Sequence, residues 1–376
     1  MNSILLDDKS QEELNNLLKN IKAKTDSFLG YPVSKDFNIE ALIEFLKYPM
    51  NNLGDPFVKS TYGVDSREQE KEVVAFFAAL FRAPKENWWG YVTNGGSEGN
   101  LYALYLAREL HPKAMVYYSE ATHYSVQKNL HLLNMSGIVI KTDKKGEIDY
   151  SDLDHNIGMN RHLPVIVLAN IGTTMTEARD DVSKIKTIIR NSAIKSYYIH
   201  ADAALSGTYS ALLNPKPSFD FEDGCDSIAI SGHKFLGSPI PSGVVVVKKA
   251  NRDRIARAVS YIGSLDTTIT GSRNGHSPLF LWYAIKTLGI EGLKKRAEHS
   301  LNVAQYTTER LREIGIEAWK NTDSITVVIP ALPEQLSKKW QLAVEDDISH
   351  LICMPNVSIE QIDHFIAELK AELQLA

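Results

Sequence analysis

The sequence predicts an α/β protein with a mainly parallel central sheet and a smaller α+β C-terminal domain. Between residues 88 and 248, short apolar runs of strand length alternate with helical patterns, which is typical of a doubly wound sheet. After about residue 278 the pattern changes to a long helical stretch, two short strands and a closing helix. With 376 residues, 44% of them apolar, the chain is long enough for a large domain and a smaller companion.

The first elements predicted along the chain are helices, and the first two of them form an N-terminal arm. Apolar residues recur at helical spacing in two segments, and a third helix leads to an aromatic-rich strand and a glycine turn. The predicted helices are 11–21, 39–46, 70–81 and 101–110, with the strand over 88–92. We expect an N-terminal arm over 1–55, a large domain over 56–277 and a small domain over 278–376.

The remaining elements follow the same periodicities. The large domain is expected to contain strands over 114–118, 137–140, 165–170, 197–201, 227–231 and 243–247, with helices over 125–133 and 182–190. The small domain is expected to contain a helix over 278–311, strands over 324–329 and 350–354, and a helix over 359–373. Ligands of parallel sheets bind beyond the carboxyl ends of the strands, so the residues that follow each strand are the first candidates for chemistry.

Composition excludes several classes of protein. The 41 basic and 46 acidic residues give a net charge of −5, without the basic field that nucleic acid requires. No apolar run approaches the ~20 residues of a membrane helix, and residues 1–10 lack the pattern of a secretory signal, so we expect a cytoplasmic protein. Cys225 and Cys353 are far apart in sequence, which favours two buried thiols over a disulfide or a metal site.

The segment Thr93–Asn100 contains a glycine turn between a strand and a helix. Backbone N–H groups of such a turn, with the positive end of the helix dipole, bind phosphate. An ordinary turn in which Ser97 caps the helix explains the segment equally well. Residues 95–99 also match G-x-S-x-G, the nucleophile elbow of serine hydrolases, for which Asp202 and His233 are the nominal partners.

Two later residues change this balance. Asp202 directly follows the strand predicted over 197–201, and Lys234 follows the strand predicted over 227–231. A phosphorylated pyridine aldehyde requires a lysine to bond with the aldehyde, a carboxylate to keep the ring nitrogen protonated, and a turn to hold the phosphate. Singly, a lysine is usually a surface charge and an aspartate a loop cap, but the combination indicates a cofactor site.

The segments Thr93–Asn100, Asn170–Thr174, His200–Ala204 and Ser231–Lys234, together with His123, resemble the pyridoxal phosphate-dependent group II amino-acid decarboxylases. The resemblance runs along nearly the whole chain and is closest to bacterial histidine decarboxylases and plant serine decarboxylases. It implies the aspartate aminotransferase-type fold, known as fold type I. It also implies a homodimer or higher homo-oligomer with the active site at the subunit interface.

The resemblance also implies roles for individual residues. Lys234 would bond to pyridoxal phosphate and Asp202 would pair with its ring nitrogen, while His123 would stack on one face of the ring and Ala204 would pack under the other. The residues implied for the phosphate are Gly95, Gly96, Ser97, Ser231 and His233. Thr173 would lie near the ring hydroxyl, although a strand-ending turn also explains its segment.

The proton donor and the substrate are less constrained by the sequence. Tyr261 is the positional candidate for donating the proton to Cα, with His123 and Lys234 as alternatives. Ser324 lies in a segment similar to bacterial histidine decarboxylases, so Ser324 and His123 are the predicted substrate contacts and L-histidine the predicted substrate. Segments 51–57 and 340–343 are more similar to the plant enzymes, which leaves conversion of L-serine to ethanolamine as the alternative. A non-catalytic relative is disfavoured because Lys234, Asp202 and His123 are all present.

Overall fold

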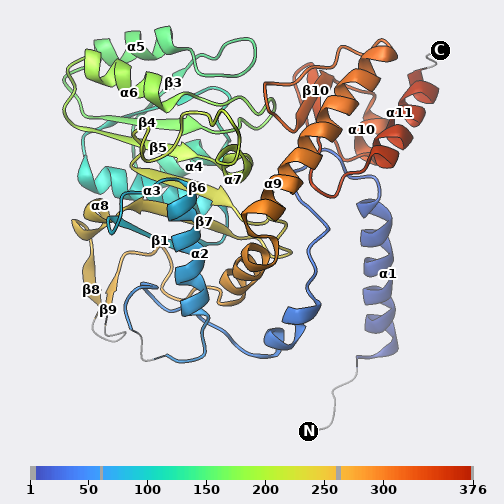
Figure 1. Cartoon of the computed structure of the whole chain (residues 1–376), viewed down its shortest axis with the longest axis horizontal. Coiled ribbons are helices and arrows are strands. Elements are labelled where there is room, and N and C mark those ends of the chain that lie inside the picture. Colours follow the sequence, from blue (N-terminus) through green and yellow to red (C-terminus); the bar gives the residue numbers. More distant parts are fainter. Residues whose placement is uncertain (1–5, 60–61, 260–263, 374–376) are drawn as a thin grey trace.

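A seven-stranded sheet forms the centre of the computed structural model, which describes residues 6–59, 62–259 and 264–373 (Figure 1). Its strand order is β1-β7-β6-β5-β4-β2-β3. Strand β7 runs antiparallel to its neighbours β1 and β6, and the other pairs are parallel. The strands are β1 (Trp88–Thr93), β2 (Met115–Ser119), β3 (Gly137–Ile140), β4 (Val165–Asn170), β5 (Tyr197–Asp202), β6 (Ser227–Ser231) and β7 (Gly243–Lys248). The prediction of a mainly parallel sheet is confirmed.

Helices cover both faces of this sheet. One face packs against α3 and α4 around Trp89, Tyr102 and Tyr198, and the other packs against α2, α5 and α6. Because both faces are covered, the central strands are apolar throughout, and β4 is buried along its whole length. The helices are α2 (Arg67–Leu80), α3 (Gly96–Leu110), α4 (Ser125–Leu132), α5 (Tyr150–Met159), α6 (Val182–Asn191), α7 (Gly207–Ser210) and α8 (Lys249–Asp253).

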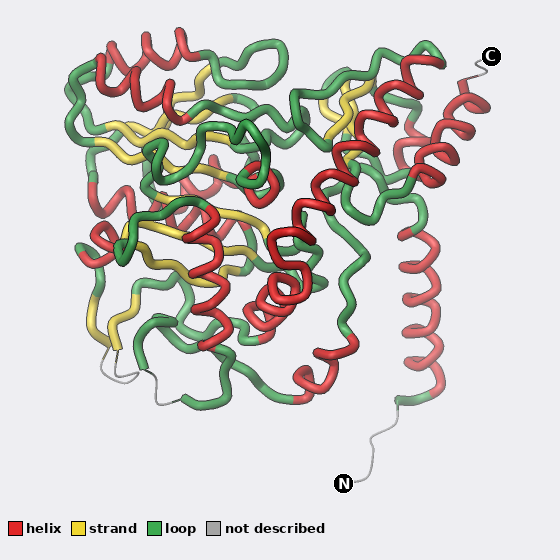
Figure 2. Tube along the Cα trace, in the orientation of Figure 1, coloured by secondary structure: helices red, strands yellow, loops and turns green. Residues whose placement is uncertain are grey.

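The C-terminal region is a smaller α+β unit, as predicted. Its antiparallel sheet has the order β10-β12-β11 and packs beside the long helix α9 (Figure 2). Helix α9 bends at Gly289, whose φ of 59° interrupts the helical backbone. The elements are α9 (His276–Glu313), β10 (Thr326–Pro330), α10 (Glu334–Lys339), β11 (Val344–Glu345), β12 (Ile348–Ile352) and α11 (Ile359–Leu373).

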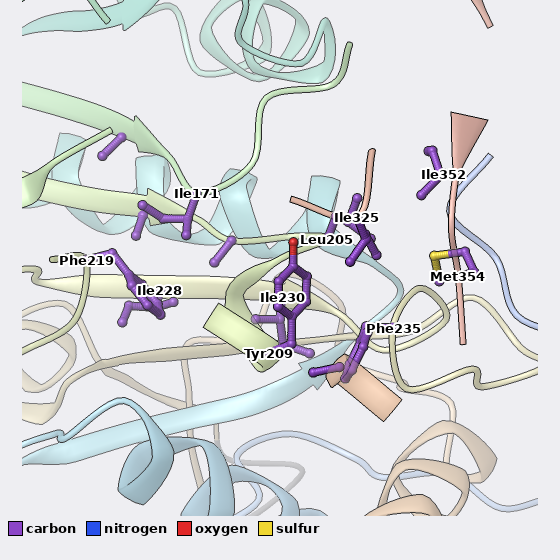
Figure 3. Close-up of a cluster of buried hydrophobic side chains, with 14 of the residues drawn as sticks. Ile171, Leu205, Tyr209, Phe219, Ile228, Ile230, Phe235, Ile325, Ile352 and Met354 are labelled. Carbon is purple, nitrogen blue, oxygen red and sulfur yellow. The ribbon is translucent and has the colours of Figure 1, made fainter. Parts of the chain in front are cut away.

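One buried apolar cluster extends from the large sheet into the C-terminal unit. Figure 3 shows Tyr209 beside Ile230, with Phe235 and Ile325 in the same cluster. The aromatic rings of Tyr209 and Phe235 have centroids 5.3 Å apart. This shared core fixes the C-terminal unit against the carboxyl ends of the central strands.

The N-terminal region is much less buried. Helix α1 (Asp8–Thr25) has no buried residue, and Asp7 caps its N-terminus by accepting a hydrogen bond from Ser10 N. Residues 40–47 form the 3₁₀ helix η1 (Glu40–Lys47) instead of the α-helix predicted over 39–46. Hydrogen bonds of the i→i+3 type close its two ends, from Leu42 N to Ile39 O and from Tyr48 N to Phe45 O. Among the described residues, no helix has the length and apolar character needed to cross a membrane.

Most predicted elements are confirmed to within a few residues, but some were missed. The elements that were not predicted are helices α5, α7, α8 and α10, strand β11, and the hairpin of β8 (Arg257–Val259) and β9 (Ser264–Asp266). These elements are short, and α5 is only weakly amphipathic, so periodicity gives little signal. Strand β10 begins at Thr326 rather than at Ser324, because the Ser324 hydroxyl accepts a hydrogen bond from Thr326 N and forms a turn.

Candidate active site

The carboxyl ends of four parallel strands meet at one edge of the central sheet. Both Thr93, at the end of β1, and Ser231, at the end of β6, are register partners of Gly243 on β7. A Cβ atom at residue 243 would lie 2.6 Å from Ile230 O and 2.8 Å from the carbonyl carbon of Gly95. Gly243 therefore allows the turn after β1 and the turn after β6 to approach each other closely.

The predicted phosphate turn is built on this contact. Gly95 has a φ of 143°, which favours glycine, and α3 begins at the next residue. Gly96 N donates to Ser231 Oγ over 3.2 Å, and a Cβ on Gly96 would lie 3.2 Å from the Ala204 methyl group. The exposed Ser97 is the second residue of the helix, so its hydroxyl lies at the N-terminus of α3, where the first backbone N–H groups have no partner within the helix. This arrangement suits a phosphate.

Asp202 lies at the end of β5, beside Asn170 at the end of β4. Its side chain is buried and oriented by two donors: Asn100 Nδ2 lies 2.6 Å from Oδ2, and Ala204 N lies 3.2 Å from Oδ1. Neither donor is charged, so the carboxylate keeps its negative charge available for a cationic group on a ligand.

Lys234 follows β6 and is half-buried. Burial lowers the pKa of its ammonium group, while the charges of Asp202 and Glu177 oppose that shift. Within the part of the chain that the structure describes, its Nζ atom forms neither a hydrogen bond nor an ion pair. A lysine amine with a lowered pKa and without a protein partner is suited to react with an aldehyde.

His123 lies in the turn before α4. Its Nδ1 atom is 3.3 Å from Ser125 N, which can only donate, so Nδ1 accepts and the ring proton is on Nε2. Burial lowers the pKa of His123, with Asp202 opposing the shift and Lys234 reinforcing it. The electrostatic influence of Asp202 and Lys234 indicates that the structure brings these three residues together.

A second buried carboxylate supports the turn that carries His123. Asn170 Nδ2 lies 3.0 Å from Thr122 Oγ1 and 3.1 Å from Asp180 Oδ2, so it joins Asp180 to the residue before His123. Burial raises the pKa of Asp180 to about 7, although Asn170 and Ile148 donate to it. The sequence analysis missed Asp180, because its role depends on contacts with distant segments.

Three other predicted residues have their polar atoms engaged by the protein. His233 Nδ1 lies 2.9 Å from Ser242 O, and Thr173 Oγ1 accepts from Ala178 N over 3.0 Å. The hydroxyl of Ser324 donates to Glu177 Oε2 over 2.8 Å and accepts from Thr326 N over 3.0 Å. The roles predicted for these residues remain predictions. Tyr261 lies outside the described residues.

Glu177 is the other carboxylate that the sequence analysis missed. It is buried after β4, where Tyr209 Oη and Ser324 Oγ donate to it and Arg179 lies 4.0 Å away. Burial raises its pKa, and Arg179 opposes the shift. Arg179 also donates to the carbonyl oxygens of Thr322 and Asp323, so the cluster connects the large domain to the start of β10.

The arrangement does not support a serine hydrolase. Ser97 lies within α3, whereas a nucleophile elbow holds its serine in the turn itself. His233 is bonded to Ser242, and Asp202 to Asn100 and Ala204, so the described contacts contain no Ser97–His233–Asp202 chain.

The same residues fit pyridoxal phosphate. The cradle of Gly95 and Gly96 has no room for a Cβ at residue 96, Lys234 has a free amine, and Asp202 has an oriented carboxylate. These three groups match the phosphate, the aldehyde and the ring nitrogen of that cofactor. The fit comes from residues on three segments that only the folded sheet brings together.

Comparisons with known proteins agree with this geometry. Residues 64–328 match the family model described as the pyridoxal-dependent decarboxylase conserved domain. The chain is 48% identical to histidine decarboxylase of Mesorhizobium japonicum over 362 residues, covering 96% of this chain and 98% of that protein. It is 46% identical to histidine decarboxylase of Morganella morganii, covering 92% and 93%.

Among solved structures, L-methionine decarboxylase from Streptomyces sp. 590 superposes with a TM-score of 0.91 at 25% identity, covering 98% of this chain and 95% of that one. The predicted aspartate aminotransferase-type fold is thereby confirmed. The match to the family model covers most of the chain, and the strand-end residues fit the cofactor of that family. The chain belongs to the pyridoxal-dependent decarboxylase family.

Proposed function

We propose that the protein decarboxylates L-histidine to histamine and carbon dioxide. The proposal is carried by the 48% identity with a histidine decarboxylase along 96% of this chain. It requires pyridoxal phosphate, which when bound withdraws electrons from the bond between Cα and the substrate carboxylate. The carboxylate leaves as carbon dioxide, and a proton takes its place on Cα.

The residues gathered at the carboxyl ends of the strands, Gly95–Ser97, His123, Asp202 and Lys234 with their neighbours, are called the strand-end cluster. Each of them has a proposed task. Lys234 holds the cofactor through its amine, and Asp202 keeps the ring nitrogen protonated. Gly95, Gly96 and Ser97 bind the phosphate with help from Ser231 and His233. The remaining contacts proposed for the cofactor ring are His123, Ala204 and Thr173.

The substrate side of the site is proposed from His123 and Ser324. His123 carries its proton on Nε2, so it can donate to an oxygen or nitrogen of the substrate. Tyr261 stays the first candidate for delivering the proton to Cα, with His123 and Lys234 as alternatives. The compartment proposed for this activity is the cytoplasm, as the sequence analysis expects.

We further propose that the protein acts as a homodimer. Four apolar side chains on one face of α1 are about half exposed: Leu14 at 51%, Leu17 at 55%, Leu18 at 52% and Ile21 at 52%. A second copy of the chain would cover this stripe. Light scattering after gel filtration should give twice the chain mass. Leu17→Glu should weaken the dimer, while Asn16→Glu, on the opposite face of α1, should not.

The substrate is tested by incubating the purified protein with pyridoxal phosphate and either L-histidine or L-serine. Histamine and carbon dioxide from L-histidine alone are the expected products. Ethanolamine from L-serine would instead establish the alternative substrate. Cofactor binding without any carbon dioxide release would show a non-catalytic relative and overturn the proposal.

A further inference from the structure

A line of buried hydrogen bonds runs from the interior of the sheet to Asp202. Asn100 Nδ2 donates to Asp202 Oδ2 over 2.6 Å, and Asn100 Oδ1 lies 2.9 Å from His200 Nε2. His200 Nδ1 in turn lies 2.8 Å from Ser227 Oγ. The side chains of Asn100, His200 and Ser227 are all buried, with exposed fractions of 0–2%.

The sheet and α3 place these residues on one face. His200 and Asp202 are two residues apart on β5, so their side chains point to the same side, which is the side that α3 covers. Ser227 is the register partner of His200 on β6. A Cβ on Gly99 would lie 2.8 Å from the Ala229 methyl group, so Gly99 lets α3 approach closely enough for Asn100 to reach β5.

The chemistry of the donors fixes the direction of every hydrogen bond. An ionised Asp202 can only accept, so the Asn100 amide nitrogen faces it and the amide oxygen faces His200. His200 must therefore carry its proton on Nε2. Burial lowers the pKa of His200 to about 4, although Asp202 and the Ser227 backbone oppose the shift, so the ring is neutral. With the proton on Nε2, Nδ1 accepts from the Ser227 hydroxyl.

We propose that Asn100, His200 and Ser227 are positioning residues that fix the rotamer of Asp202 and leave its full negative charge for the ring nitrogen of the cofactor. This inference rests on the cofactor role proposed for Asp202. A positively charged histidine at residue 200 would partly neutralise Asp202 and compete with the ring nitrogen for it. The neutral hydrogen-bonded residues Asn100, His200 and Ser227, called the relay below, orient the carboxylate without that competition.

The test compares pyridoxal phosphate with its 1-deaza analogue, in which a C–H group replaces the ring nitrogen. Asn100→Leu should weaken binding of pyridoxal phosphate to the apoprotein by about ten- to one hundredfold, the effect typical of a lost hydrogen bond to a charged group. His200→Leu should weaken it by about five- to tenfold, because it removes the neutral hydrogen bond that orients Asn100. Binding of the deaza analogue should change less than about threefold, because it does not use Asp202 in this way. His200→Gln, which keeps an N–H donor toward Asn100, should restore binding of pyridoxal phosphate.

The outcomes separate this inference from the proposed function. If both variants lose binding of pyridoxal phosphate and of the deaza analogue equally, the relay only maintains the fold. If the binding of both compounds is unchanged, the relay does nothing for Asp202. Either result overturns the inference. Failure of the wild-type protein to bind pyridoxal phosphate would instead overturn the proposed function. Nitrogen-15 NMR of the wild-type apoprotein gives an independent check, since a His200 proton on Nδ1 at pH 7 contradicts the relay.

Discussion

The strand-end cluster and the junction formed by Glu177, Arg179 and Ser324, beside the start of β10, both contain buried polar groups, but they differ in what those groups leave free. Lys234 has no described hydrogen-bond partner, and Asp202 is held by two neutral donors. At the junction, Glu177 accepts from Tyr209 and Ser324 and lies beside Arg179. The difference teaches that buried polarity alone does not identify a reactive site, whereas an ionisable group with unused bonding capacity, beside an oriented charge, points to one.

The largest effect should follow from removing the Lys234 amine, which has no partner among the described residues. We expect Lys234→Ala to reduce histamine formation by about a thousandfold or more, because no other described residue supplies an amine at that position. The melting temperature of the apoprotein should change little. Exposed Lys249→Ala is the control, and comparable activity of Lys234→Ala and Lys249→Ala would place the reactive lysine elsewhere.

At the junction the largest effect should be on stability rather than on chemistry. Glu177→Ala leaves the largely buried Arg179 side chain, 12% exposed, without its partner carboxylate, which costs about 3 kcal/mol in the free energy of unfolding. Urea denaturation of the apoprotein measures this difference, with the exposed Glu298→Ala as control. A stability loss no larger than that of the control would show that the junction does not depend on this carboxylate.

The buried His200 should make stability depend on pH. Its folded-state pKa of about 4 lies below the unfolded value of 6.5, so between these values the unfolded chain binds more protons. The associated stability is present above pH 6.5 and is lost as the pH falls toward 4, by about 3 kcal/mol in total. Denaturation curves at several pH values should show this slope in wild type and a shallower slope in His200→Gln.

The smallest expected effect concerns Ser324, which the sequence predicts at the substrate and the structure places at the junction. Ser324→Ala removes a hydrogen bond to Glu177, so we expect the free energy of unfolding to fall by about 1 kcal/mol. Ser300→Ala is the matched control, because the buried Ser300 hydroxyl has no described partner. The KM for L-histidine tests the substrate contact separately: an increase beyond about threefold would support it.

The sequence predicted those parts of the fold and site that depend on local pattern. Strand ends, the glycine turn, Asp202 and Lys234 follow from periodicity and from residue types adjacent in the chain. Asn100 stood within the glycine segment, but nothing local indicated that it contacts Asp202, 102 residues away. Likewise Glu177 bonds to Ser324 across 147 residues, which periodicity cannot reveal.

The contact at Gly243 has a consequence for how the protein acquires its site. The two turns that it brings together are joined by the hydrogen bond from Gly96 to Ser231, which spans 135 residues of sequence. Closing such a loop is entropically costly, and the two turns meet across β7, which lies between β1 and β6. We therefore expect the phosphate cradle to form late in folding, so that the recovery of cofactor binding during refolding reports the completion of this part of the sheet.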